Sequence, residues 1–223
     1  MSRPRMRGTL RAVLAVLVPL VFLTGFTPWP QPVPVVSRID TDEPVVFLTI
    51  DDGWHHDPAA ARLLLDRRVP ASLFVLPGAY AYDSAYFQSL LAHGPSRIEN
   101  HTVNHPDLTA LDGPAQRAEI CGARDRHLAQ FGDGPRLFRP PYGTYDEETR
   151  SAARACGAKA LVTWTHDLTT WGGGTPAPTP ELKAGDIVLL HFTENLAADL
   201  ARVLAAADAA GLEPAQLRDY VTE

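Results

Sequence analysis

Two adjacent carboxylates, Asp51 and Asp52, come directly after an apolar run at residues 45–50. A run of β-branched and aromatic residues that stops at turn residues predicts a buried strand. Both acids are therefore expected where a strand emerges into a loop, which is the edge of an α/β sheet where ligands bind. Taken alone, such a pair is more often a simple Asp-Asp-Gly turn. Its chemistry depends on what else the chain brings to this edge.

A pair of histidines, His101 and His105, stands four residues apart in the segment HTVNH. A single helical turn would bring both imidazoles onto one face, close enough to share one ion. Pro106 disfavours helical geometry at His105, so this turn must be short. With a strand-end aspartate nearby, the histidines would complete a His-His-Asp set that leaves coordination positions open, as catalytic metal sites do.

Strands and helices alternate along the chain from residue 45 onward, which predicts a parallel sheet with right-handed crossovers. Each group of polar residues lies just past a predicted strand. This distribution favours a distorted (β/α) barrel, with its site at the C-terminal ends of the strands, over an open sheet. The predicted strands are 45–50, 69–76, 97–100, 137–139, 159–164 and 186–191, and the predicted helices are 59–67, 84–93, 113–131, 146–156 and 195–210.

The N-terminal region has the pattern of an export segment. Four arginines within residues 3–11 precede an apolar run at 12–26, which is shorter than the about 20 residues of a spanning helix. We expect residues 1–27 to be a signal peptide or an uncleaved membrane anchor, residues 28–44 a proline-rich linker, and 45–223 the folded domain. The protein is then expected outside the cytoplasm, either secreted or membrane-held.

The net charge is −6 and the basic residues beyond the N-terminus are scattered, so no nucleic acid partner is expected, and we expect a monomer. Export to an oxidising compartment makes a disulfide between Cys121 and Cys156 possible. Both cysteines would also suit helix cores as small apolar residues.

Four motifs occur in the order and spacing of the polysaccharide deacetylases, the carbohydrate esterases with a NodB-homology domain. These are TIDDG at 49–53, HTVNH at 101–105, RPPYG at 139–143 and LLH at 189–191. The resemblance extends from residue 45 to the C-terminus. It implies a distorted (β/α) barrel and a divalent metal, usually zinc. It also implies removal of acetyl groups from a polymeric sugar, most often N-acetylglucosamine.

The resemblance also implies roles for individual residues. Asp51 resembles the general base that takes a proton from the attacking water, and His191 resembles the general acid that protonates the leaving amine. The remaining roles are metal ligation by Asp52, His101 and His105, orientation of Asp51 by Arg139, oxyanion stabilisation by the N–H of Tyr142, and substrate binding by Trp171, Leu189 and Pro141.

One motif departs from the family pattern, which usually reads Asp-x-x-Asp-Trp. Here Asp167 and Trp171 are kept, but Thr170 stands where the second aspartate belongs. A carboxylate beside an imidazole favours its protonated form more than a hydroxyl does. We therefore expect Thr170, at His191 in place of that carboxylate, to favour the protonated imidazole less, unless Asp167 or Glu194 supplies the missing charge.

Two other function classes fit parts of the pattern. Two histidines and one carboxylate also build non-haem iron oxygenases, but the βα alternation disfavours their β-barrel. A degenerate deacetylase that binds cell-wall glycan without turnover would not need Asp51, Arg139 and His191 intact. The polymer stays open between peptidoglycan, chitin oligomers, acetylxylan and a small N-acetylated sugar.

Overall fold

The computed structural model describes residue 1 and residues 31–222. The predicted signal or anchor segment thus lies, apart from Met1, outside the described residues. Within residues 31–222, no helix is long and apolar enough to cross a membrane.

One curved sheet of nine strands organises the domain, in the order β1-β6-β5-β4-β3-β2-β8-β7, with β9 paired to β2. Every pairing of these strands is parallel. The two edges, β1 and β7, do not pair with each other, so the sheet curls into the predicted distorted (β/α) barrel without closing. The strands are β1 Val35–Val36, β2 Val45–Asp52, β3 Ser72–Val75, β4 Arg97–Asn100, β5 Leu137–Phe138, β6 Ala160–Val162, β7 His166–Asp167, β8 Ile187–His191 and β9 Glu213–Pro214.

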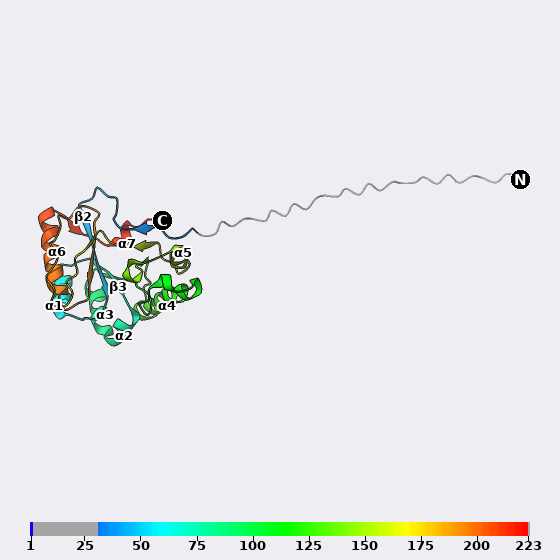
Figure 1. The fold of residues 1–223 in the computed structure, drawn as a ribbon, viewed down its shortest axis with the longest axis horizontal. Coiled ribbons are helices and arrows are strands. Elements are labelled where there is room, and N and C mark those ends of the chain that lie inside the picture. The colour runs from blue at the N-terminus through cyan, green and yellow to red at the C-terminus, as the bar shows by residue number, and fades with distance from the viewer. Residues whose placement is uncertain (2–30, 223) are drawn as a thin grey trace.

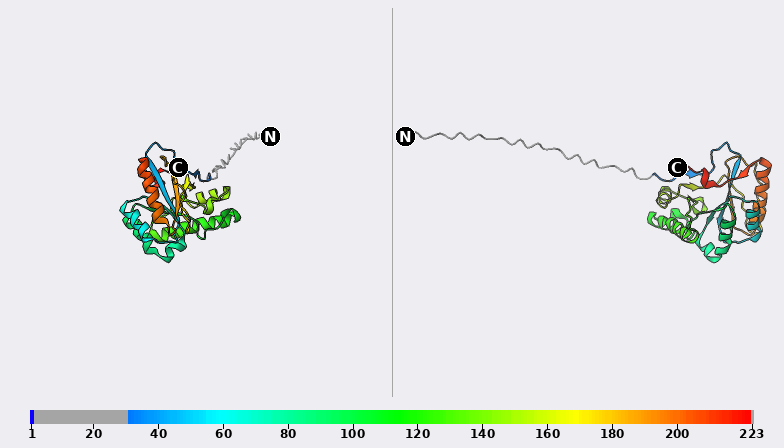
Figure 2. Two further views of the ribbon diagram at one scale, coloured as in Figure 1. Left: turned by 60° about the vertical axis from the view of Figure 1, so that its left-hand side comes forward. Right: turned by 180° about the vertical axis from the view of Figure 1, so that it is seen from behind.

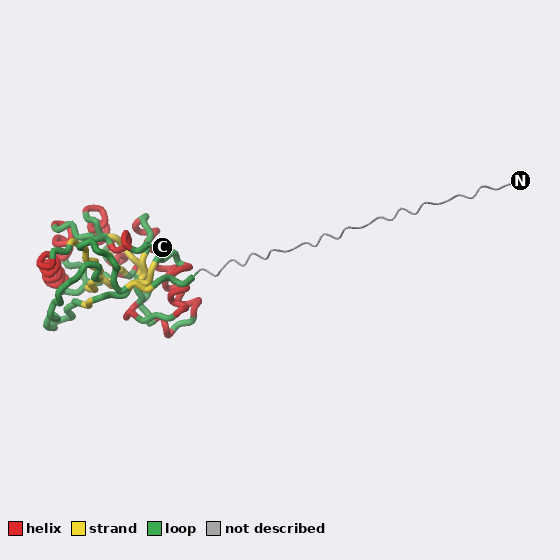
Figure 3. Tube along the Cα trace, turned by 90° about the horizontal axis from the view of Figure 1, so that it is seen from above, coloured by secondary structure: helices red, strands yellow, loops and turns green. Residues whose placement is uncertain are grey.

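Helices cover the outside of the sheet in two groups (Figures 1 and 2). Helices α1 and α6 pack together on one flank and α4 and α5 on the other. Figure 3 shows the sheet held between these groups. The helices are α1 Pro58–Asp66, α2 Pro77–Tyr82, α3 Ser84–His93, α4 Gly113–Phe131, α5 Glu147–Ala155, α6 Leu196–Ala210 and α7 Leu217–Tyr220, with short 3-10 turns at Leu108–Ala110 and Pro141–Gly143.

Local sequence explains where the main helices begin. Asp57 caps α1 by accepting from the Ala59 N–H at 2.8 Å, and a proline follows in the first turn. Asp112 caps α4 in the same way through the Ala115 N–H at 2.9 Å. These side chains satisfy N–H groups that have no partner inside the helix.

The two faces of the sheet have different compositions because side chains alternate along a strand. On β2, Leu48 and Ile50 face the helices in the larger apolar cluster. Phe47 packs in a second cluster, inside the curl of the sheet. Asp51 lies four residues after Phe47 and so faces the same side of the sheet. It is in register with His191 of β8. The pleat therefore directs both polar side chains to the inner face, at the C-terminal end of their strands.

The structure corrects the predicted linker at residues 28–44. Within it, Val35–Val36 forms β1 and pairs with β6, and Val33 and Ile39 are buried. The domain thus begins before residue 45. The prolines that suggested a spacer are compatible with a short edge strand, because an edge strand is hydrogen-bonded on one side only.

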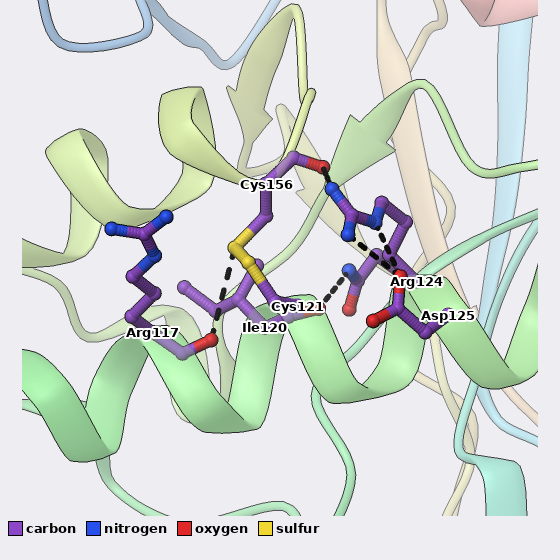
Figure 4. The surroundings of a disulfide bond; sticks show 7 residues. Arg117, Ile120, Cys121, Arg124, Asp125 and Cys156 are labelled. Atoms are coloured by element: carbon purple, nitrogen blue, oxygen red, sulfur yellow. Dashed lines mark hydrogen bonds and ion pairs between the residues drawn. A yellow bond between two sulfur atoms is a disulfide. The ribbon is translucent and has the colours of Figure 1, made fainter.

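A disulfide joins Cys121 of α4 to Cys156 at the end of α5, with a Cα separation of 4.9 Å (Figure 4). The bond predicted as possible is therefore present. Arg124 lies beside it, where its guanidinium donates to the Cys156 carbonyl and pairs with Asp125. The cross-link fixes the two helices that flank β5.

Candidate active site

The three predicted metal ligands converge on one point. Asp52 Oδ1 lies 3.5 Å from His101 Nε2 and 3.4 Å from His105 Nε2. These three atoms form the one group of potential metal-binding side chains found among the described residues. Asp52 Oδ1 is buried and has no hydrogen-bond partner among the described residues. A buried carboxylate oxygen without a donor, facing two imidazoles, fits a cation that would complete its coordination.

The orientation of His101 is set by its second ring nitrogen. Nδ1 lies 2.8 Å from the Arg139 carbonyl oxygen, which can only accept a hydrogen bond. Nδ1 must therefore carry the proton when the ring is neutral, which leaves the Nε2 lone pair directed at Asp52. The strand ends β4 and β5 are adjacent, so the sheet itself places this pair.

The predicted helical turn between the two histidines is wrong. Thr102 and His105 both have a positive φ, 72° and 58°, so the segment is an irregular loop. The Glu119 carboxylate of α4 stabilises this loop by accepting from the N–H groups of Val103 and Asn104. Glu119 lacks a motif signal in the sequence, since only the fold brings α4 under the loop.

Backbone strain is concentrated at this site. Five non-glycine residues of the described chain have a positive φ, and four of them are Asp52, Thr102, His105 and Tyr142. Such conformations cost about 1–3 kcal/mol each and persist where the surroundings enforce them. The strain is therefore concentrated in the loops that carry the converging ligands.

A buried ion pair holds the second carboxylate. Asp51 Oδ1 accepts from Arg139 Nη1 at 2.7 Å, and both side chains are almost fully buried. The guanidinium is fixed in turn by Thr49, by the carbonyls of Val162 and Thr163, and by stacking 4.3 Å above the Phe74 ring. Asp51 Oδ2 has no hydrogen-bond donor among the described residues and lies 3.8 Å from His101 Nε2. One oxygen is thus anchored and the other is available.

These groups line a pocket of about 340 Å³ at the C-terminal ends of the strands. Its rim carries two exposed aromatic rings, Tyr142 and Trp171, and Leu189 forms part of its apolar wall. Pro141, predicted to bind substrate, is buried and does not line the pocket, whereas Pro140 does. The full lining is Asp51, Asp52, His101, His105, Pro140, Tyr142, Gly143, Trp164, Asp167, Trp171, Leu189 and His191.

The backbone N–H of Tyr142, predicted to be a hydrogen-bond donor to substrate, lies on a tight turn. Its N–H has no acceptor among the described residues, and its φ of 60° results from the tight turn after Pro141. Its ring packs edge-on against His105, with centroids 4.7 Å apart. The peptide group is thus fixed next to the ligand set.

The surroundings of His191 differ from the prediction. His191 Nδ1 lies 2.8 Å from Thr169 Oγ1, and the Trp171 ring packs against the imidazole at 4.6 Å. Thr170, expected here, instead bonds to Asp199 of α6. Asp167 lines the pocket, but its carboxylate accepts a hydrogen bond from the Thr169 N–H. The contact of Thr169 was missed because it depends on Asp199, which bonds to Thr170. Asp199 was missed because α6 is distant in sequence from this loop.

Electrostatics favour the protonation states that metal binding needs at two of the three ligands. Burial raises the pKa of Asp52, but His101, His191 and His105 outweigh it, and the pKa lies below its usual value. Burial and the nearby His101 lower the pKa of His105. At His101 burial acts to lower the pKa, yet Asp51 and Asp52 raise it above the usual value. The site therefore offers an ionised carboxylate and, at His105, a neutral imidazole.

A curled parallel sheet with carboxylates and imidazoles gathered at its C-terminal edge defines a (β/α)-barrel protein with a site suited to hydrolysis. Comparison with known sequences identifies the family. The chain belongs to the polysaccharide deacetylase family, whose sequence profile matches residues 38–161.

Individual relatives agree with this assignment. The chain is 41% identical over 193 residues to an uncharacterized protein of Streptomyces coelicolor, covering 84% of this chain and 77% of the relative. It is 34% identical over 159 residues to a chitooligosaccharide deacetylase of Rhizobium leguminosarum bv. phaseoli, covering 68% and 69%. A family 4 carbohydrate esterase from Bacillus anthracis has the same fold, with a TM-score of 0.72, 24% identity, and coverage of 84% and 86%.

Proposed function

We propose that this protein is a metal-dependent deacetylase that removes N-acetyl groups from N-acetylglucosamine residues of a carbohydrate polymer. The observation that carries the proposal is the convergence of Asp52, His101 and His105 beside the open oxygen of Asp51. The rim of the pocket, with the rings of Tyr142 and Trp171 exposed to solvent, suits a sugar chain that extends beyond one residue. The chitooligosaccharide deacetylases among the relatives support this substrate class.

Asp52, His101 and His105 would hold the cation, for which zinc suits one carboxylate and two imidazoles. A cation there would polarise the acetyl carbonyl and acidify a water molecule next to Asp51. The ligand geometry and the chemistry of the family support this choice of metal.

Asp51 acts as the general base. Because Arg139 fixes Oδ1, the unpaired Oδ2 takes the proton from the attacking water while the carboxylate keeps its orientation. The Tyr142 N–H donates to the carbonyl oxygen as negative charge develops on it, and the turn holds this donor in place before the reaction begins.

His191 acts as the general acid. Nδ1 is hydrogen-bonded to the Thr169 hydroxyl, so Nε2 is the nitrogen that can carry a proton toward the pocket. This proton passes to the nitrogen of the sugar as the bond from nitrogen to the acetyl carbon breaks. The methyl group of the acetyl fits against Leu189 and Trp171, which line the same pocket.

We further propose that the protein works outside the cytoplasm, secreted or held at the membrane by its N-terminal segment. The arginine-flanked apolar run at residues 12–26 supports export. The Cys121–Cys156 disulfide supports an oxidising compartment. Detection of the full-length protein in the cytosolic fraction would contradict this location.

Acetate release from a substrate panel tests the proposed activity. We expect zinc-dependent release from chitin oligomers or peptidoglycan, loss of release with a chelator, and much slower release from acetylxylan. The fold alone does not imply turnover. If no substrate releases acetate with zinc present while the protein still binds the glycans, the protein is a glycan-binding member of the family.

A further inference from the structure

The loop between β7 and β8 contacts His191 through two residues that flank a third. Thr169 Oγ1 lies 2.8 Å from Nδ1, and Trp171 packs on the ring. Thr170, between them, is buried and contacts α6 instead. Thr170 thus points away from His191 while both of its neighbours contact the ring, so fixing residue 170 also fixes the direction of these two neighbours.

Asp199 provides this fixation. Its Oδ2 accepts from the Thr170 N–H and its Oδ1 from the Thr170 hydroxyl, both at 2.7 Å. Asp199 is 2% exposed and lies in the first turn of α6, where the helix favours negative charge. Two short bonds from one residue to a buried carboxylate leave Thr170 little freedom.

Arg202, one turn further along α6, closes the arrangement. Its Nη2 donates to Asp199 Oδ1 and to the Leu168 carbonyl, both at 2.8 Å, and its Nη1 donates to Thr179 Oγ1 at 2.7 Å. The charge of Asp199 is thereby compensated inside the protein. The loop is tied to α6 on both sides of Thr170.

We propose that Asp199 is a positioning residue that acts on His191 through Thr170 and Thr169. By fixing Thr170 it places the Thr169 hydroxyl on Nδ1, which turns Nε2 toward the pocket. This inference rests on the proposed function, in which Nε2 gives its proton to the leaving amine. Once Nε2 has given up its proton, Nδ1 still carries one and can donate it to the Thr169 hydroxyl, so the ring need not move.

Kinetics of Asp199→Asn give the first test. Asparagine keeps the shape but has one acceptor oxygen for three donors, so the clamp on Thr170 is weakened. We expect kcat to fall about tenfold with KM unchanged, the effect of one lost orienting hydrogen bond. Thr169→Val should lower kcat at least as much, and Thr169→Ser should restore it. In the Thr169→Val background, Asp199→Asn should cost less than about twofold more, because the two residues act in series.

Asp186→Asn is the matched control. Asp186 is also 2% exposed and bonds to the Lys183 N–H and to His166, away from His191. It should lose stability without a change in kcat. Equal losses of kcat in Asp186→Asn and Asp199→Asn, or additive losses in the double variant with Thr169→Val, would overturn the proposal.

Nitrogen-15 NMR of the neutral His191 ring tests the inference without reference to activity, with His191→Gln assigning the signal. We expect a single tautomer in the parent protein, set by the bond between Thr169 and Nδ1, and a mixture of two in Asp199→Asn. Should that variant not fold, Thr170→Val removes one donor from Asp199 and should give the same change. Unchanged spectra would refute the positioning role. A tautomer change in a protein that releases no acetate would refute the proposed function alone.

Discussion

Two buried arginine–carboxylate pairs lie on the inner side of the sheet. They differ in whether both oxygens of the carboxylate are hydrogen-bonded. In one pair, Glu99 of β4 bonds to Arg218 of α7 at 2.7 Å, and its other oxygen accepts from the N–H groups of Arg136 and Leu137. In the other pair, Asp51 of β2 bonds to Arg139 at the same distance. Here the second oxygen has no donor among the described residues.

On the proposed function, this difference separates a structural pair from a catalytic one. A carboxylate whose oxygens are all hydrogen-bonded stabilises the fold, and removing its partner leaves a buried charge. A carboxylate with one anchored and one open oxygen stays oriented and still accepts a proton. Burial and ion pairing alone, which both share, would not distinguish them.

Of the two arginine replacements, Arg139→Met should give the larger effect on function. Without the guanidinium, Asp51 loses the bond that orients it, and a displacement of about 1 Å can cost roughly 100-fold in rate. We expect kcat for acetate release to fall about 100-fold or more, together with a loss of stability. A variant with normal kcat would show that Asp51 does not need this anchor.

Arg218→Met is the corresponding change in the other pair. It leaves Glu99 buried and without its charged partner, which should lower the free energy of unfolding by about 3–5 kcal/mol. Denaturant unfolding measures this loss. The kcat of the folded protein should stay within twofold of the parent value, and a fall as large as that of Arg139→Met would erase the distinction between the pairs.

Replacing both cysteines by serine provides a stability reference that lies outside both pairs. The cross-link spans 35 residues, so its loss should lower the free energy of unfolding by about 3–4 kcal/mol through the entropy of the unfolded chain. Thermal unfolding with and without reductant checks the effect. If reductant leaves the parent's melting temperature unchanged, the bond contributes nothing to stability.

His127 gives the smallest effect and tests a buried base without a charged partner. It is fully buried in α4, its Nε2 has no partner among the described residues, and burial lowers its pKa to about 4. The ring therefore binds a proton near pH 6.5 in the unfolded chain, whereas in the folded protein it stays neutral until about pH 4. Stability contributed by the neutral ring is complete above pH 6.5 and falls as the pH drops toward 4.

Between pH 6.5 and pH 5 this loss amounts to about 2 kcal/mol. In His127→Gln, which cannot titrate, unfolding measured over the same range should show a correspondingly shallower pH dependence. Parallel curves for the two proteins would mean that the pKa of His127 is the same in the folded and the unfolded protein.

The sequence predicted those helices and strands whose two ends carry local sequence signals. Helix α3 and helix α4 match the predicted ranges, because aspartate caps begin both and a glycine follows each. Strand β4 also matches. The two-residue strands β1 and β7 were not foreseen as strands, since their pairing depends on distant partners and leaves no periodic pattern.

The same holds for the candidate site, where motif residues were predicted and contacts between distant segments were not. Motif residues such as Asp52 and His105 meet as predicted, because the strand ends converge in this fold. The loop between the histidines is not helical, because Glu119, more than ten residues away, holds it in another form. Likewise Thr169 rather than Thr170 meets His191, since Asp199 of α6 captures Thr170. Such contacts between distant residues have no local signature.

Asp51→Asn, measured for zinc binding and acetate release on the same sample, tests the central claim most directly. The amide keeps the shape and the bond from Arg139 but cannot accept the proton of the attacking water. We predict one zinc ion bound per chain with the parent's affinity and acetate release reduced about 1000-fold. Parent-like acetate release, or loss of zinc along with activity, would contradict the separation of base and ligand between Asp51 and Asp52.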